Sequence, residues 1–335
     1  MTTDAEKIGK RVTETLENVG TFLGESLGFI ETSGTIFIPG ACGVIGYRVA
    51  NRLLDAGYPT LRVGARCPAK VETLNKRGAE IADFCWDNEA TYDKALAGVK
   101  SVFCTTPYVK NWSRQFPAFL RACQKAGVRN FVKVSFYHSR RLKEVFQNVP
   151  LVALHGMCDD LLAESGIPYT ILSASHFMSN PFVFQGQELR REQKPAPYYG
   201  ASTNHGINYV SPNDVAEVAT RVLLAPKEHH GKEYTLTGPE TITDQEVAGL
   251  LSEHLKKPIM YSEQPLHFFE DTEKMSGHPI WMVKDLVTIE QIKASGKEEL
   301  PQFYSSDFEN LCGHKAESFE EYLMAKDRMT ALECA

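Results

Sequence analysis

Three glycines lie three residues apart in the segment GACGVIG, directly after a short apolar run and before a helical pattern. In such a loop Gly40 permits a tight turn, Gly43 lets the backbone approach a pyrophosphate, and Gly46 lets the helix pack on the preceding strand. The amino terminus of the helix adds unpaired N–H groups and a partial positive charge. We therefore expect this loop to hold the pyrophosphate of a dinucleotide. The predicted contacts are Gly40, Cys42, Gly43, Val44, Ile45 and Gly46.

The segment after the second expected strand favours NADP(H) over NAD(H). A site for NAD(H) places Asp or Glu there, about 20 residues past the loop, to bind the ribose 2′-hydroxyl. The chain has no acid between Gly64 and Lys70, but it has Arg66. Arg66 can bind a 2′-phosphate through two hydrogen bonds and Lys70 can add a second charge, although both could instead be solvated cations of a surface loop.

Candidates for proton transfer are few. His155 has Asp159 one helical turn later, so the carboxylate could orient an imidazole that titrates near neutral pH. His176 and Tyr108 follow expected strands, at the edge of the sheet where a cleft should open. The catalytic candidates are thus His155, His176 and Tyr108, against the alternatives of a surface His–Asp pair and packed side chains of a cleft wall.

The order of the expected elements brings these residues to one edge of a sheet. Short apolar runs predict strands over residues 35–38, 61–65, 80–84, 101–104, 130–135 and 169–172. Helical patterns lie between them, over residues 46–56, 71–76, 89–97, 113–126 and 154–165. Alternating strands and helices with short connections predict a doubly wound parallel α/β sheet of the Rossmann type, covered on both faces.

Three further elements extend this pattern. We expect Asp214 to cap the next helix, and residues 233–236 to form a seventh strand. Thr243, with Glu246 three residues on, predicts a capping box for a helix over residues 245–255.

The chain divides into three predicted parts. Residues 34–180 form the dinucleotide-binding domain, which residues 206–240 complete. Residues 181–205 and 241–330 are rich in Pro, Gly and aromatic residues, and we assign them to a smaller α+β carboxy-terminal domain beside a cleft. Residues 1–33 are an extension with the pattern of an amphipathic helix, because apolar residues recur every three or four positions.

The composition argues against several classes of function. With 335 residues, a formal net charge of −6 and a pI of about 6.0, the chain lacks the clustered positive charge of a nucleic-acid binder. It contains no run of about eighteen apolar residues, so no transmembrane segment is predicted. Its eight cysteines form no CxxC pair, and no metal site is predicted. We expect a reduced, intracellular, cytoplasmic protein, whereas an organelle transit peptide removed before Met1 would leave no trace.

Over roughly residues 34–258 the chain resembles the NmrA-like family of atypical short-chain dehydrogenases. The resemblance implies a Rossmann domain that binds NADP(H) in an extended pose, with a small carboxy-terminal domain over a cleft. It rests on motifs spread along the chain: GACGVIG, RCP from Arg66, FCWD from Phe84, TTP from Thr105, HGMCDDLLAESG from His155, IPYTIL from Ile167, FMSN from Phe177, NDVA from Asn213 and YTLTGP from Tyr234.

The resemblance also implies cofactor contacts by position, from the adenine to the nicotinamide end. In that order they are Cys85 and Trp86 beside the adenine, Thr105, Thr106 and Pro107 under the ribose, Ser135 near the nicotinamide ribose, and Ser173 at the nicotinamide end. The chain departs from the family pattern at Cys42, where Thr is usual, at Cys85, where Asp is common, and at Ser173, where Arg is frequent.

Two functions stay open. The better-known short-chain dehydrogenases donate a proton from a Tyr with a Lys four residues on, whereas Tyr137 has Arg141 at that spacing. Hydride transfer to a quinone or a small conjugated carbonyl compound needs mainly orientation and exclusion of water, which favours an NADPH-dependent oxidoreductase without the Tyr–Lys pair. The alternative is a non-catalytic NADP(H) redox sensor that regulates a partner protein. An aromatic acceptor pocket would be lined by Tyr108, Trp112, Phe177, Phe182 and Phe184.

Overall fold

The computed structural model describes most of the chain, namely residues 34–106, 111–137, 139, 150–190 and 192–325. The predicted amino-terminal helix, Pro107 and Tyr108 therefore lie outside the described residues. Within these ranges, no helix combines the length and the apolar character needed to cross a bilayer.

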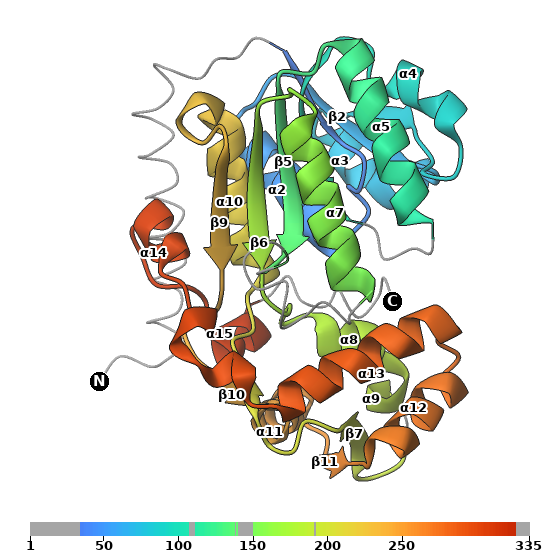
Figure 1. Ribbon diagram of the computed structural model, residues 1–335, viewed down its shortest axis with the longest axis vertical. Helices are drawn as coiled ribbons and strands as arrows, with labels where there is room; N and C mark the ends of the chain where they lie inside the picture. The colour runs from blue at the N-terminus through green and yellow to red at the C-terminus, as the bar shows by residue number, and fades with distance from the viewer. Residues whose placement is uncertain (1–33, 107–110, 138, 140–149, 191, 326–335) are drawn as a thin grey trace.

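Seven parallel strands form one central sheet, in the order β3-β2-β1-β4-β5-β6-β9 (Figure 1). The strand order reverses between β1 and β4, and ligands of such sheets bind at this point, outside the carboxyl ends of the strands. The predicted α/β fold of the Rossmann type is confirmed. The strands are β1 (Thr35–Ile38), β2 (Leu61–Ala65), β3 (Glu80–Asp83), β4 (Val99–Thr105), β5 (Asn130–Phe136), β6 (Tyr169–Ala174) and β9 (Lys232–Leu236).

Helices cover both faces of this sheet (Figure 1). Successive strand residues point to opposite faces, and each face carries an apolar cluster that helices bury. Ile36 of β1 belongs to the apolar cluster on one face, whereas Phe37 belongs to the cluster on the other. The first face carries α2 (Val44–Asp55), α3 (Glu72–Lys76) and α10 (Pro212–Leu224). The second face carries α4 (Tyr92–Ala95), α5 (Trp112–Ala126) and α7 (Pro150–Glu164).

The start of α10 differs from the prediction. Asp214 does not cap this helix, because Pro212 occupies its first turn and the Ser211 hydroxyl accepts a hydrogen bond from the Asn213 N–H. Proline suits the first helical position, where its missing N–H costs nothing. Asp214 instead accepts a hydrogen bond from the N–H of Glu317 and so anchors the carboxy-terminal segment.

The small carboxy-terminal domain lies beyond the carboxyl ends of the strands (Figure 1). The predicted capping box of Thr243 and Glu246 is present at its helix α11. Its strands pair as β7 (Ala196–Gly200) with β11 (Ile259–Glu263) and as β8 (Gly206–Ile207) with β10 (Ile242–Thr243). Its helices are α8 (Asn180–Phe184), α9 (Gly186–Arg190), α11 (Asp244–Leu255), α12 (Leu266–Met275), α13 (Ile280–Ala294) and α15 (Phe319–Met324).

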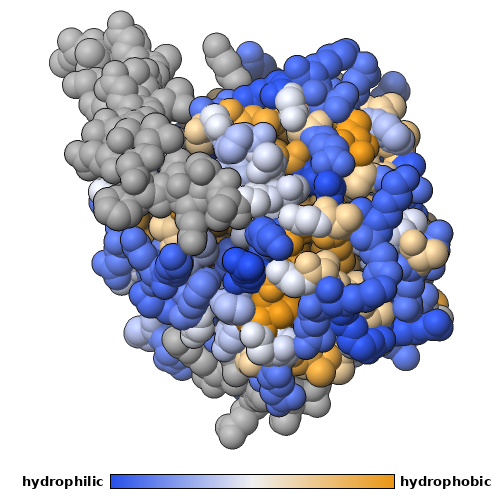
Figure 2. Space-filling view, turned by 90° about the horizontal axis from the view of Figure 1, so that it is seen from above, coloured by the Kyte–Doolittle hydropathy of each residue, from blue (hydrophilic) through white to orange (hydrophobic). Residues whose placement is uncertain are grey.

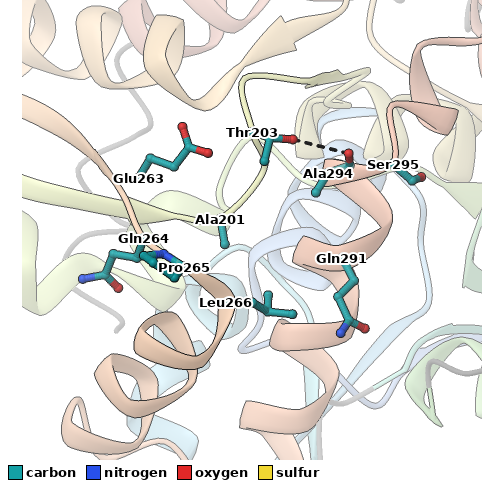
Figure 3. A pocket seen from close by; sticks show the side chains of 9 residues that line it. All are labelled: Ala201, Thr203, Glu263, Gln264, Pro265, Leu266, Gln291, Ala294 and Ser295. Atoms are coloured by element: carbon teal, nitrogen blue, oxygen red, sulfur yellow. Dashed lines mark hydrogen bonds between the residues drawn. The ribbon is translucent and has the colours of Figure 1, made fainter.

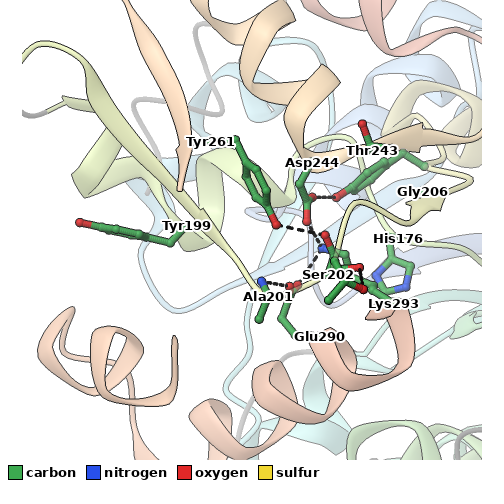
Figure 4. Close-up of polar contacts among 12 residues, drawn as sticks. His176, Tyr199, Ala201, Ser202, Gly206, Thr243, Asp244, Tyr261, Glu290 and Lys293 are labelled. Atoms are coloured by element: carbon green, nitrogen blue, oxygen red, sulfur yellow. Dashed lines mark hydrogen bonds and ion pairs between the residues drawn. The ribbon is translucent and has the colours of Figure 1, made fainter. Parts of the chain in front are cut away.

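A buried ionic cluster joins the elements of the small domain (Figure 4). Nζ of Lys293 on α13 lies 2.6 Å from Oδ2 of Asp244 and 2.7 Å from Oε1 of Glu290. The second oxygen of Glu290 accepts a hydrogen bond from the Ala201 N–H, and that of Asp244 accepts one from the Tyr209 phenol. Burial lowers the pKa of Lys293, but the two carboxylates outweigh burial and raise it well above its ordinary value. Lys293 is therefore charged.

One later segment returns to the Rossmann sheet. Helix α14 (Asp307–Cys312) lies beside the edge strand β9, where the Asp307 carboxylate accepts a hydrogen bond of 2.7 Å from the Thr235 N–H. Phe308 is buried in the same apolar cluster as β1 and α10. Part of the range 241–330, predicted for the small domain, thus packs on the Rossmann domain and covers its edge.

Figure 2 looks onto the end of the molecule opposite the small domain. Hydrophilic residues occupy most of the visible part of this face, and apolar residues form smaller areas between them. This is the distribution of an ordinary solvent-facing surface.

Glu217 on α10 connects three segments of the fold. Its carboxylate lies 3.0 Å from Arg221, 3.2 Å from His314 and 3.7 Å from Arg52 of α2. Burial alone would raise the pKa of Glu217, but the hydrogen bond to His314 and the charge of Arg52 lower it to about 2. A carboxylate with a lowered pKa stabilises the fold above its unfolded pKa, and this contribution is lost as the pH falls through the folded one.

We expect Glu217→Gln to lower the free energy of unfolding by about 3 kcal/mol near pH 6. Each unit of difference between the pKa of Glu217 in the folded and in the unfolded protein corresponds to about 1.4 kcal/mol of stability. The difference from the parent should shrink below pH 4.5 and vanish near pH 2. Urea unfolding of the parent and the variant at several pH values measures this difference in the free energy of unfolding. Glu80→Gln is the control, because Glu80 is 60% exposed beside Arg62 and such pairs contribute about 1 kcal/mol or less. Equal losses for both variants would contradict the assignment.

Candidate functional site

The glycine loop between β1 and α2 has no room for a side chain at Gly40 or Gly46. A Cβ at Gly46 would lie 2.2 Å from the carbonyl oxygen of Gly40, and one at Gly40 would lie 2.8 Å from Oγ1 of Thr105. The Gly43 N–H donates to the Gly40 carbonyl across a tight turn, at 3.0 Å. The loop therefore brings the start of α2 into contact with the end of β1, as the glycine spacing predicted.

The amino terminus of α2 fits an anion. Its N-cap is Gly43, which supplies no side-chain cap, and its first turn contains no acidic residue. Cys42 and Gly43 are both exposed. Uncapped N–H groups and the helix dipole make such a terminus suitable for phosphate. The residues present therefore fit a dinucleotide pyrophosphate.

Two cations lie beside this loop, after the end of β2. Arg66 follows Ala65, the last residue of β2, and Lys70 lies in the short 3₁₀ turn Pro68–Val71. Both side chains are exposed, and in the described part of the chain neither has a hydrogen-bond or ion-pair partner. Because β2 is the neighbour of β1, both residues lie at the same edge of the sheet as the glycine loop.

Some of the residues predicted to contact the adenine or the acceptor are partly exposed, and others are buried in the core. Cys85 and Trp86 follow β3 and are partly exposed, as an adenine contact requires. Trp86 packs against Trp112, with ring centroids 4.8 Å apart. Trp112 and Phe182 are 0% and 3% exposed within apolar clusters, so they do not line an acceptor pocket as predicted. Trp112 is buried because it lies in the first turn of α5, on the side that packs against the sheet.

A buried polar network lies between β5 and α7. The Asp159 carboxylate accepts hydrogen bonds from Lys133 at 2.7 Å, from Ser135 at 2.5 Å and from Ser139 at 2.9 Å. Among the described residues, no hydrogen bond joins Asp159 to His155, so the predicted orienting role is not found. The carboxylate binds Lys133 instead, because both side chains are 0% exposed and each neutralises the other.

His155 contacts this network from one helical turn earlier. Its Nδ1 lies 3.4 Å from Oγ of Ser135 and 3.5 Å from Oγ1 of Thr106. Burial lowers the pKa of His155 well below its ordinary value, and the charge of Lys133 lowers it further. The imidazole is therefore neutral at neutral pH, where it can form hydrogen bonds but does not carry a proton to donate as an acid.

The two serines predicted at the nicotinamide end already have partners. The hydroxyl of Ser135 donates to Asp159, and that of Ser173 donates to Oε1 of Glu233 on the neighbouring β9, at 2.8 Å. Both residues are almost fully buried. Either hydroxyl can bind a cofactor only by exchanging its partner, so their predicted roles stay predictions.

His176 lies just beyond β6 and contacts Glu298, for which the sequence predicted no role. Its Nε2 is 3.0 Å from Oε1 of Glu298, and the same oxygen accepts a hydrogen bond from the phenol of Tyr137. Glu298 is 1% exposed and Tyr137 is 0% exposed. No local pattern signals this group, because Glu298 is 122 positions from His176 and 161 from Tyr137.

The hollow in Figure 3 belongs to the small domain. It has a volume of about 580 Å³, and no predicted cofactor or catalytic residue lines it. In the described part of the chain, no group of three His, Cys, Asp or Glu residues could hold a metal ion. The lining residues are Ala201, Thr203, Glu263, Gln264, Pro265, Leu266, Gln291, Ala294 and Ser295.

Comparison with known proteins gives the family. The profile of the NmrA-like family matches residues 32–323. The chain belongs to the NmrA-like family. It is 32% identical over 238 residues to a (4-alkanoyl-5-oxo-2,5-dihydrofuran-3-yl)methyl phosphate reductase of Streptomyces griseus, with 68% of this chain and 76% of that protein covered. It is 28% identical over 226 residues to an NAD(P)H azoreductase of Xenophilus azovorans, with the same coverage of 68% and 76%.

Solved structures of other proteins share the fold. The NADPH-dependent quinone oxidoreductase of Escherichia coli, in complex with NADPH, superposes with a TM-score of 0.72 and 24% identity. The match covers 86% of this chain and 98% of that one, so the similarity includes the small domain as well as the Rossmann sheet.

We expect Gly46→Ala to weaken NADPH binding at least about tenfold, which is about 1.4 kcal/mol, because its Cβ must displace backbone on the other side of the turn. Isothermal titration calorimetry measures the affinity. Gly249→Ala is the matched control, since a Cβ on this helical glycine of α11 meets no atom within 4 Å. The control should keep its affinity and gain up to about 1 kcal/mol of stability. Unchanged affinity in Gly46→Ala would contradict the assigned phosphate site.

Proposed function

We propose that this protein is an NADP(H)-dependent oxidoreductase that passes hydride to a quinone or a small conjugated carbonyl compound. The observation that carries the proposal is the uncapped amino terminus of α2, held against Gly40 through Gly46 and flanked by the exposed Arg66. Together these groups suit a diphosphate and one further phosphate. The relatives from Streptomyces and Xenophilus are both reductases, which supports the chemistry of hydride transfer.

The preference for NADP(H) over NAD(H) rests on charge at the end of β2. An acid at this point would bind the ribose 2′-hydroxyl of NAD(H) and repel a phosphate. Arg66 stands there instead, and a planar guanidinium can bind phosphate through two parallel hydrogen bonds. Lys70, one turn further on, adds a second positive charge.

Bound NADPH supplies the hydride, so the chain has to bind and orient the reactants and exclude water. The residues Thr106, Ser135 and His155 place hydroxyl and imidazole groups at the carboxyl ends of β4 and β5. Because the lowered pKa of His155 keeps it neutral, it can hydrogen-bond a polar group of a ligand without adding charge. Reduction of a quinone does not require a Tyr–Lys pair, because hydride transfer needs mainly orientation of the reactants and exclusion of water.

The proposed activity is tested by mixing the protein with NADPH and a panel of quinones and conjugated enones while the absorbance of the reduced nicotinamide is followed. We expect oxidation that depends on the acceptor and disappears in Gly43→Val, whose side chain would fill the turn above Gly40. Tight NADPH binding without oxidation across the panel would count against an enzyme and favour a redox sensor that regulates a partner protein.

Cofactor preference gives a second test. We expect Arg66→Ala to weaken NADPH binding about 10- to 100-fold and to leave NADH binding nearly unchanged, because a charge-assisted hydrogen bond contributes about 1.5–3 kcal/mol. Titration of both cofactors measures the ratio. Arg121→Ala, which removes an exposed guanidinium from α5, is the control and should change neither affinity. Equal weakening of NADPH and NADH would contradict a role for Arg66 at the 2′-phosphate.

A further inference from the structure

The carboxylate of Glu298 reaches from the small domain to the carboxyl end of the Rossmann sheet. It lies in the 3₁₀ turn Lys297–Glu299, between α13 and α14, and is 1% exposed. Its Oε1 meets His176, just past β6, and Tyr137, just past β5. Its Oε2 is buried and has no hydrogen-bond partner among the described groups. A merely structural link would be expected to use both oxygens, because an unpaired buried acceptor is costly.

The charges of this group follow from its surroundings. Burial raises the pKa of Glu298, but the charge of His176 and the hydrogen bonds from His176 and Tyr137 outweigh burial and lower it below its ordinary value. Lys293 lowers it further. Burial and the nearby carboxylate raise the pKa of Tyr137 well above its ordinary value, so the phenol keeps its proton and donates. Glu298 is therefore an anion that accepts from two donors.

The anion fixes the orientation of the imidazole. A carboxylate accepts hydrogen bonds, so Nε2 of His176 carries a proton and Nδ1 is the nitrogen left to contact a ligand. In the described chain Nδ1 has no hydrogen-bond partner.

Glu298 is the charged group that contacts His176, because the other titratable groups nearby are neutral or bound to other partners. The phenol rings of Tyr137 and Tyr209 lie 6.0 and 6.3 Å away, centroid to centroid. Burial raises the pKa of both phenols well above the ordinary value, so both are neutral. Lys293 acts on Glu298 and is itself held by two carboxylates. The anion of Glu298 is therefore the charged group in contact with His176, whereas burial and then the charge of Lys133 oppose protonation of His155.

We infer that Glu298 is a positioning residue that holds His176 as the proton donor to the acceptor, and that His176 rather than His155 gives this proton. The inference rests on the proposed oxidoreductase function. In the step, the Nδ1–H bond of His176 breaks and an O–H bond forms on the acceptor. The two electrons and the other hydrogen come from NADPH, which is oxidised, and the imidazole regains a proton from solvent.

The test compares Glu298→Gln, which keeps the shape and a hydrogen-bond acceptor but removes the charge, with Glu299→Gln. Glu299 is the matched control, because it is the next residue and also contacts a histidine, His205, but is 40% exposed. The first readout is nitrogen-15 NMR of the cofactor-free proteins across pH. We expect the protonation midpoint of His176 to move to lower pH in Glu298→Gln and to stay in place in Glu299→Gln.

The second readout is the pH profile of kcat. In Glu298→Gln we expect kcat to fall about tenfold or more and its alkaline limb to move to lower pH, with NADPH affinity unchanged. Glu298→Asp should restore part of the loss. His176→Gln, which tests the same step should Glu298→Gln fold poorly, should lose about 100-fold in kcat, and His155→Gln much less.

The outcomes separate the inference from the proposed function. Failure of the parent protein to oxidise NADPH with any acceptor removes the proposed function. Normal turnover in the parent, with an unchanged His176 midpoint and an unchanged kcat profile in Glu298→Gln, overturns the inference alone. A fall in kcat without any movement of the midpoint or the alkaline limb also overturns it, because Glu298 would then act only as a structural link.

Discussion

The contact between Gly46 and the carbonyl of Gly40 is the constraint on which the site depends. Because a Cβ at Gly46 would lie 2.2 Å from that oxygen, α2 can begin directly above the carboxyl end of β1 only if this residue is glycine. The helix dipole and the uncapped N–H groups then point at the place where the strand order reverses. Arg66 lies at the same edge of the sheet, because it directly follows β2, which pairs in parallel with β1 and ends beside it.

Two histidines at this edge of the sheet are both buried, yet their electrostatic surroundings are opposite. Burial and the charge of Lys133 keep His155 neutral, whereas His176 lies 3.0 Å from the carboxylate of Glu298. In a poorly polarisable interior, burial and the nearest charges together decide which protonation state of a titratable side chain prevails. The site thus contains one neutral imidazole and one imidazole held by an anion, and acid–base sites commonly place pairs of titratable residues in such different surroundings.

The parts of the fold that the sequence predicted are those with local signals. The strands Thr35–Ile38 and Leu61–Ala65 have their predicted bounds, because apolar runs between turn residues define them. Asp214 was assigned the wrong role because Ser211 and Pro212, three and two residues earlier, give a stronger signal for the start of the helix. The site was only half predictable. The glycine loop is contiguous, but Lys133 looks like any strand residue until Asp159, 26 positions on, lies against it, and Glu298 meets His176 from 122 positions away.

Charged side chains of the small domain act on the ionisation of Glu298, in addition to the packing of this domain beyond the carboxyl ends of the strands. Lys293 helps to keep Glu298 ionised, and Asp244 and Glu290 in turn keep Lys293 charged. The buried ionic cluster of α11 and α13 is therefore coupled to His176 through Glu298, although none of its members belongs to the Rossmann sheet. Desolvating so many charges is expensive, and apolar side chains could fill the same space at no such cost. The cluster instead joins α11, α13 and the segment at Ala201, and through Lys293 it helps to keep Glu298 ionised beside His176.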